Sequence, residues 1–139
     1  MARDLSGSGQ YLQSSTSCAN YTVSTFSFSA WIHPDDVSNA TKSMLAFKGD
    51  AASSGWYVHL AAASNGNIRL LTSQAGVYQY TDTATGVINT SGWQHIGITL
   101  NGTACKIYVN GTEVSYAHTD SHIGPVSSII GWYIGRTSA

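Results

Sequence analysis

Residues 92–114 read GWQHIGITLNGTACKIYVNGTEV, and this stretch decides the fold. Apolar and polar residues alternate in it, which is the pattern of strands that bury one face. The pairs Asn101-Gly102 and Asn110-Gly111 separate the alternating runs. Asn-Gly is the preferred sequence of type I′ turns, because both central residues of that turn need a positive φ. The stretch from Ile96 to Val114 is therefore predicted to be an antiparallel meander.

A second alternating run precedes it, at residues 26–32, with the sequence FSFSAWI. Phe26, Phe28, Ala30 and Ile32 share one face, which is predicted to be the core face. Trp31 points the other way, together with two serines. Pro34 follows the run, and proline cannot continue a central ladder.

Shorter runs bounded by Gly, Asn, Ser or Asp occur along the rest of the chain, whereas helical periodicity is almost absent. They predict further strands at 10–12, 43–48, 56–62, 68–72, 77–80, 113–116 and 132–136. The Asn65-Gly66-Asn67 step is another hairpin signal. Together these patterns predict one all-β domain over residues 1–139, a two-sheet antiparallel jelly-roll sandwich.

Composition narrows the class of protein. The 139 residues suit one domain, and 42% hydrophobic residues can fill its core. Six Lys and Arg against seven Asp and Glu build no positive surface, so nucleic acid is not an expected partner. No stretch approaches the roughly 20 apolar residues of a spanning helix, so no membrane insertion is expected. The first residues lack the apolar core of a signal peptide.

Cys18 and Cys105 can form one bridge at most, and the sequence leaves their pairing open. Cys105 alternates with Ile107 and Val109 in a predicted strand. We therefore expect a buried free thiol at Cys105.

The order of five segments resembles the laminin G-like, concanavalin A-like lectin/glucanase jelly-roll family. The segments are GSGQYL (7–12), FSFSAWIHP (26–34), SGWYVHL (54–60), GWQHIGITLNGTACKIYVNGTEV (92–114) and YIGR (133–136). The resemblance covers residues from about Gly7 to Arg136 and implies the sandwich fold. It implies no single function, because this fold hosts lectins, glycosidases, adhesion modules and virion proteins.

The sequence departs from the family at its end. Members usually continue past YIGR with a glycine and an acidic strand that returns beside the N-terminal strand, whereas this sequence stops at Thr137-Ser138-Ala139. Either the chain is cut short or the fold is closed differently. An absent strand leaves a sheet edge unpaired. We expect a neighbouring subunit, in a homo-oligomer, or an unusual terminal segment to cover that edge.

The residues argue against an enzyme. Retaining glycosidases on this fold resemble one another in a Glu-x-Asp-x-x-Glu strand, which supplies the two carboxylates that cleavage needs. This sequence has one glutamate, Glu113, and its aspartates fall in predicted loops. It also lacks a Gly-x-Ser-x-Gly elbow. His95 is interpreted as a packing residue, and the pair His118 and His122 as part of a solvated loop.

Relatives often hold calcium with loop oxygens, and hard cations prefer carboxylates and carbonyls. Asp82 and Asp120 are the candidate metal ligands, although no dense acidic cluster is present. No other cofactor is expected.

Binding is the better-supported activity. Aromatic faces stack on the C–H surfaces of sugars, and carboxylates and amides bind the hydroxyls. The candidate ligand residues are Trp31, Tyr78, Tyr80 and Asp82, whereas Trp56, Trp93 and Trp132 are expected in the core.

These features favour a non-catalytic lectin-like module that binds glycan or another cell-surface polymer. The alternative is a virion structural protein, such as a capsid decoration or tail component, that contacts neighbouring capsid or surface proteins. Either function places the chain outside the cell or on a virion surface.

Overall fold

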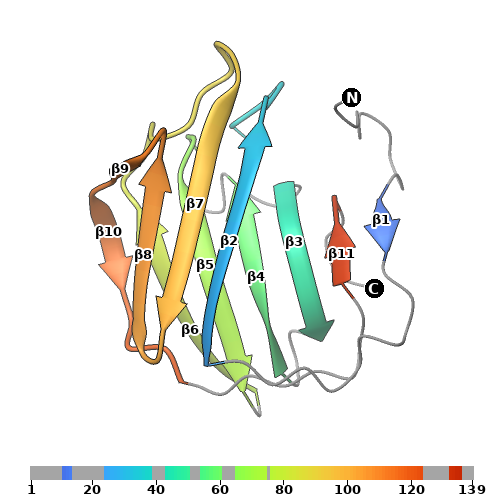
Figure 1. Cartoon of the computed structure of the whole chain (residues 1–139), viewed down its shortest axis with the longest axis vertical. Helices are drawn as coiled ribbons and strands as arrows, with labels where there is room; N and C mark the ends of the chain where they lie inside the picture. The colour runs from blue at the N-terminus through green and yellow to red at the C-terminus, as the bar shows by residue number, and fades with distance from the viewer. Residues whose placement is uncertain are drawn as a thin grey trace.

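The computed structural model describes residues 11–13, 24–38, 43–50, 54–60, 65–74, 76–123 and 132–135. The described residues form eleven strands and no helix, so none of them belongs to a helix that could span a membrane (Figure 1). The strands are β1 (Leu12–Gln13), β2 (Thr25–Ile32), β3 (Ser43–Asp50), β4 (Ser54–Leu60), β5 (Ile68–Gln74), β6 (Val77–Thr83), β7 (Gln94–Asn101), β8 (Ala104–Val109), β9 (Thr112–Glu113), β10 (Tyr116–Thr119) and β11 (Trp132–Ile134).

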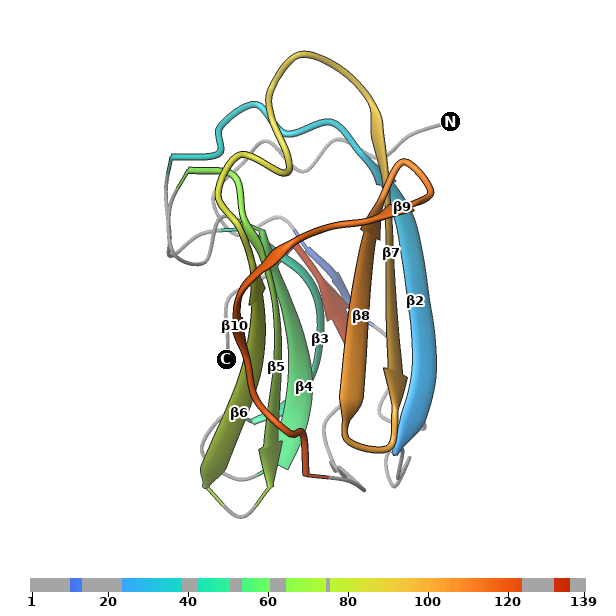
Figure 2. The ribbon, with the colours of Figure 1, turned by 90° about the vertical axis from the view of Figure 1, so that its left-hand side faces the viewer.

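The strands form two antiparallel sheets that face each other, as Figure 2 shows. One sheet has seven strands in the order β1-β11-β3-β4-β5-β6-β10, and the other has four in the order β2-β7-β8-β9. The predicted all-β sandwich is confirmed. The predicted strand at 113–116 is wrong in its bounds, because the chain leaves the small sheet after Glu113 and joins the large sheet at Tyr116.

The predicted meander is β7, β8 and β9, which are neighbours in the four-stranded sheet. Asn110 and Gly111 have φ values of 50° and 82°, as a type I′ turn requires. The other turn differs from the prediction. Asn101 pairs with Ala104, so Gly102 and Thr103 are its central residues, and only Gly102 has a positive φ, of 62°. This is the pattern of a type II′ turn.

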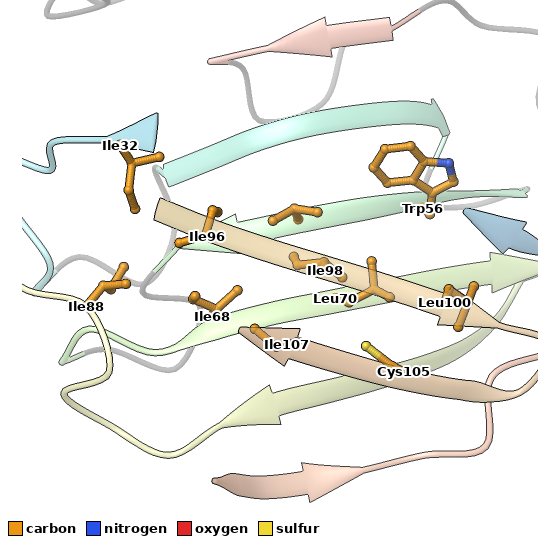
Figure 3. Close-up of a cluster of buried hydrophobic side chains, with 11 residues drawn as sticks. Ile32, Trp56, Ile68, Leu70, Ile88, Ile96, Ile98, Leu100, Cys105 and Ile107 are labelled. Atoms are coloured by element: carbon orange, nitrogen blue, oxygen red, sulfur yellow. The ribbon is translucent and has the colours of Figure 1, made fainter. Parts of the chain in front are cut away.

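The core lies between the sheets and follows from the alternation of the strands. In β7, Ile96, Ile98 and Leu100 are fully buried, and the residues between them face outward. Figure 3 shows side chains from both sheets meeting in this layer. Phe26 of β2 stacks on Trp56 of β4 across the sandwich, with ring centroids 4.5 Å apart. Trp56 is therefore a core residue as predicted, whereas the side chain of Trp132 lies outside the described part.

One end of the inner layer is polar. His122 is fully buried, and its two ring nitrogens lie 2.8 Å from Thr72 Oγ1 and 2.9 Å from Thr81 Oγ1. Its backbone N–H donates to the carbonyl of Thr103, in the turn that joins β7 and β8 of the small sheet. His122 thus joins the two sheets, and the predicted solvated loop is wrong at this position. Burial lowers the pKa of His122, because the apolar surroundings disfavour the charged ring.

Cys105 lies nearby in the inner layer as a buried free thiol, as predicted. Burial raises its pKa to about 12, so the thiol stays protonated at neutral pH and is a poor nucleophile. Cys18 lies outside the described residues.

The two terminal strands lie together at one edge of the large sheet, where β1 pairs with β11 and β11 pairs with β3. In the small sheet β2 is an outer strand, and among the described strands it pairs with β7 alone. That a second subunit or a terminal segment covers such an edge stays a prediction.

Gly66 joins three loops at one end of the sandwich. Its N–H donates to the carbonyl of Val37, and its own carbonyl accepts from the N–H of Ile88. Its φ is +72°, and a Cβ added there would lie 2.2 Å from the carbonyl oxygen of Ile88. Both the backbone conformation and the close approach therefore require glycine.

Gly66→Ala is expected to lower the free energy of unfolding by about 3 kcal/mol or more, because it adds a backbone clash to the cost of a left-handed residue. Urea unfolding measures this. Gly86→Ala is the matched control, since Gly86 has a similar φ of +75° but open space around its Cβ position. Gly86→Ala should lower the free energy of unfolding by about 1–2 kcal/mol. Equal losses in the two variants would contradict the role of the clash.

Candidate functional site

The four predicted ligand residues do not form one site. Trp31 is in β2 of the small sheet and alternates with core residues, so it points away from the core. Tyr78, Tyr80 and Asp82 are in β6 of the large sheet and alternate with the inward-facing Thr81. In Figure 2, β2 and β6 belong to opposite layers. Trp31 and the other three therefore lie on opposite outer faces of the sandwich.

The outer face of the large sheet carries a row of polar side chains across β4, β5, β6 and β10. Its members are paired in register and are, in order, His59, Arg69, Asp82 and His118. We call these four residues the polar row. Asp82 lies within β6, and the prediction of a loop position is wrong. Its inward neighbours Thr81 and Thr83 are polar although buried, so the apolar alternation that predicts a strand stops before them.

Arg69 and Asp82 form the centre of the polar row. Arg69 Nε and Nη2 donate to the two carboxylate oxygens of Asp82 over 2.6 Å each. The side chains are 24% and 9% exposed. The bond to Asp82 raises the pKa of Arg69 further. A bidentate pair of this kind fixes both side chains.

Tyr80 packs between two members of the polar row. The guanidinium carbon of Arg69 lies 4.4 Å from the centroid of the Tyr80 ring, and the His118 ring stacks on it with centroids 4.3 Å apart. Arg69 comes from β5 and His118 from β10, the strands on either side of β6, so the two groups cover the ring from opposite sides. Both faces of Tyr80 are thus covered from within the protein. Tyr78 remains 47% exposed.

Asp120 holds the edge of this stack. Its Oδ2 accepts from the backbone N–H of Tyr80, and its Oδ1 lies 2.9 Å from His118 Nε2. The backbone hydrogen bond from Tyr80, followed by the contact with His118, lowers the pKa of Asp120. Both carboxylate oxygens of Asp120 are engaged, as are those of Asp82.

The described residues contain no group of three or more His, Cys, Asp or Glu placed to hold a metal ion. A calcium site at Asp82 and Asp120 stays a prediction, and such an ion would compete with Arg69 for Asp82.

The outer face of the small sheet is different, because its large side chains are exposed. Trp31 is 65% exposed and Trp93 is 55% exposed. Trp31 pairs in register with His95, and their rings meet edge to face at 5.3 Å. His33 and Trp93 make the same kind of contact at 5.6 Å. We call these four residues the aromatic surface.

Trp93 was expected in the core, and that expectation is wrong. Gln94, Ile96, Ile98 and Leu100 face inward along β7, which places Trp93 and His95 outward. Applying the alternation of Ile96, Ile98 and Leu100 to Trp93 would have identified this.

The turn between β8 and β9 supports the aromatic surface. The His95 N–H donates to Asn110 Oδ1 over 2.9 Å, and the Asn110 N–H donates to the His95 carbonyl over 2.8 Å. The type I′ turn that places Asn110 therefore fixes the backbone of His95. His95 does have a packing role, but on the outer face.

The glutamate is also engaged in a structural contact. Glu113 binds Lys106 Nζ over 3.0 Å and accepts from the Tyr116 hydroxyl over 3.1 Å. Asp82, Asp120 and Glu113 are thus each bound to a cation, a hydroxyl or a backbone N–H.

The polar row makes stability depend on pH through His59. Burial, followed by the positive charge of Arg69, lowers the pKa of His59 from 6.5 to about 4. Below pH 6.5 His59 is protonated in the unfolded chain, whereas in the folded chain it stays neutral down to about pH 4. Stability from this residue is therefore complete above pH 6.5 and is lost as the pH falls from 6.5 to 4.

Between pH 7.5 and pH 5 the free energy of unfolding should fall by about 2 kcal/mol through His59, and somewhat more with His122. Urea unfolding at the two pH values measures the change. In His59→Gln the loss between the same pH values should be clearly smaller. An unchanged loss in this variant would show that His59 does not carry the effect.

Comparison with known proteins agrees with this architecture. A family model described as the concanavalin A-like lectin/glucanases superfamily matches residues 6–139. No curated protein matches the sequence. Among solved structures, the carbohydrate-binding module CBM66 from Bacillus subtilis is similar, with 19% identity and a TM-score of 0.51, over 83% of this chain and 70% of that one. At this identity the similarity concerns the fold. By its sequence and its fold, the chain belongs to the concanavalin A-like lectin/glucanase superfamily.

Proposed function

We propose that this chain is a non-catalytic carbohydrate-binding module that binds saccharide with its aromatic surface. One observation carries the proposal, namely that two tryptophans of the aromatic surface, Trp31 in β2 and Trp93 directly before β7, are more than half exposed. Large apolar rings that stay exposed to water contribute little to the stability of the fold. Neighbouring exposed aromatic groups of this kind mark binding sites.

The chemistry of the aromatic surface suits a sugar. Indole rings pack on the apolar C–H face of a sugar ring, and the indole N–H can donate to a hydroxyl. His33 and His95 add ring nitrogens that donate or accept hydrogen bonds. The edge-to-face contacts with these histidines hold the tryptophans in place. Such preorganised rings lose little conformational freedom on binding.

The polar row is the weaker candidate for this function. Tyr80 has both ring faces covered, and Asp82 is bound on both oxygens by Arg69. A ligand there would have Tyr78 and the outer side of His118 for stacking. The similarity to a carbohydrate-binding module supports saccharide binding by the fold without choosing a face. A module of this kind would act outside the cell.

A second candidate function is that of a structural subunit in an assembly such as a virion. The outer position of β2 favours it, because this eight-residue strand has no charged side chain and pairs among the described strands with β7 alone. Such an edge can accept a strand from another subunit. Native mass spectrometry together with a saccharide-binding assay distinguishes the two functions, since a structural subunit should form a closed oligomer and bind no saccharide.

Trp31→Ala and Trp93→Ala are each expected to weaken binding to an immobilised neutral polysaccharide by about 10- to 100-fold, the usual effect of removing a central aromatic contact. Affinity electrophoresis against a panel of glucan, mannan, galactan and fructan measures this. Both tryptophans are exposed, so thermal unfolding should change little.

Tyr78→Ala on the opposite face is the matched control, because Tyr78 is 47% exposed and also lies in a strand. Its binding should equal that of the wild type. Loss of binding in Tyr78→Ala with unchanged binding in both tryptophan variants would move the site to the polar row. No binding by the wild-type chain to any saccharide would refute the proposed function.

A further inference from the structure

Gly97 lies in the middle of β7, beside the aromatic surface. It pairs with Ser29 of β2 on one side and with Tyr108 of β8 on the other. Its missing side chain belongs to the outer face, because Ile96 and Ile98 on either side of it are buried in the core. A glycine in a strand interior costs conformational entropy and gives nothing to pack.

The fold itself does not need this glycine. Gly97 is not among the described residues with a positive φ, and the pairing of β7 with both neighbours runs through it without a bulge. A Cβ added at Gly97 would meet Tyr108 Cβ at 3.8 Å and Tyr108 Cδ2 at 4.0 Å, which are ordinary contacts. An alanine Cβ would therefore fit beside the Tyr108 side chain. A strand glycine that neither a positive φ nor a bulge requires can mark a place where a ligand approaches the strand closely.

The outward neighbours of Gly97 connect it to the aromatic surface. Along β7 the next outward residue is His95, which contacts Trp31. Across the strands the neighbours are the small Ser29 and the partly buried Tyr108. Ser29 and Gly97 are small residues paired side by side on the outer face, so the layer of side chains is thin there, and we call this thin place the gap. Trp31 and His95 border this gap on one side, and Tyr108 borders it at the end.

We infer that the backbone of Gly97 is the floor of the binding site and that the ligand is a neutral saccharide, whose ring lies over Gly97 against Trp31. This inference rests on the proposed function. A side chain at Gly97 would occupy the place of the sugar ring. The glycine is thus kept for binding, at a cost to the strand.

The charges around the gap determine the ligand class. Neither the aromatic surface nor the row of Ser29, Gly97 and Tyr108 contains a Lys or Arg. Lys106, on the far side of this row, is held by Glu113 over 3.0 Å. Glu113 itself pairs with Tyr108 at the end of the row, and Asp35 lies 3.9 Å from His33 at the other border. With Lys106 held by Glu113 and Asp35 at the border, this row offers an acidic sugar no free Lys or Arg, which favours an uncharged sugar.

The test uses Gly97→Val and Gly97→Ala in the full chain, with Thr99→Val as the control on the same strand and the same face. Binding is measured by affinity electrophoresis against glucan, mannan, galactan and fructan, with polygalacturonate as the acidic comparator. Unfolding in urea and native mass are measured in parallel. We expect Gly97→Val to unfold at the same or a higher urea concentration than the wild type and to bind at least tenfold more weakly. Gly97→Ala should also bind more weakly, and Thr99→Val should bind normally.

Each other outcome is decisive. Unchanged binding in Gly97→Val, with loss in Trp31→Ala, would overturn the role of Gly97 and leave the proposed function standing. Binding to polygalacturonate alone would overturn the ligand class. A dimeric wild type that becomes monomeric in Gly97→Val would show that a second copy occupies the gap, which overturns the inference. Failure of the wild type to bind any of these polymers would refute the proposed function and this inference together.

Discussion

The unbroken pairing of β2 with β7 is the constraint on which the rest of the structure depends. Because side chains alternate between the two sides of a strand, one register decides which residues of both strands enter the core. It places Phe28 and Ile98 inward, and it places Trp31 opposite His95 on the outer face. A shift of β2 by one residue would turn Trp31 inward and Phe26 and Phe28 outward. The same pairing therefore builds the core and the aromatic surface.

The two outer faces differ in how their polar groups are used. On the large sheet, Arg69, Asp82, Tyr80 and His118 bind one another, so the face is held together by its own contacts. On the small sheet, Trp31 and Trp93 have histidine neighbours at their edges and solvent over much of their surface. A surface whose groups are already paired has little left to offer a ligand. This difference is why we place the site on the small sheet.

The sequence predicts the sandwich well, because the alternation in β2, β7 and β8 is apolar and the Asn110-Gly111 turn has its own signature. It predicts less where the inner layer is polar. Thr81, Thr83 and His122 are buried, but their partners are far away in the sequence, so nothing local marks them as inward. For the site, the alternation of its strand predicts that Trp31 faces outward. That Trp31 and Tyr80 lie on opposite faces cannot be predicted in this way, because it depends on which sheet each strand joins. Trp93 was missed because its large apolar ring was assigned to the core although it is out of phase with Ile96 and Ile98. Gly97 was missed because a glycine alone does not reveal its surroundings.

The central claim is that saccharide binds over β2 and β7 on the outer face of the small sheet. The most direct measurement is an amide and indole NMR titration of the wild-type chain with an oligosaccharide of the polymer that it binds. The account predicts that the largest shift changes occur at Ser29, Trp31, Trp93, His95 and Gly97. Changes confined to Tyr78, Tyr80, Asp82 and His118 would contradict it.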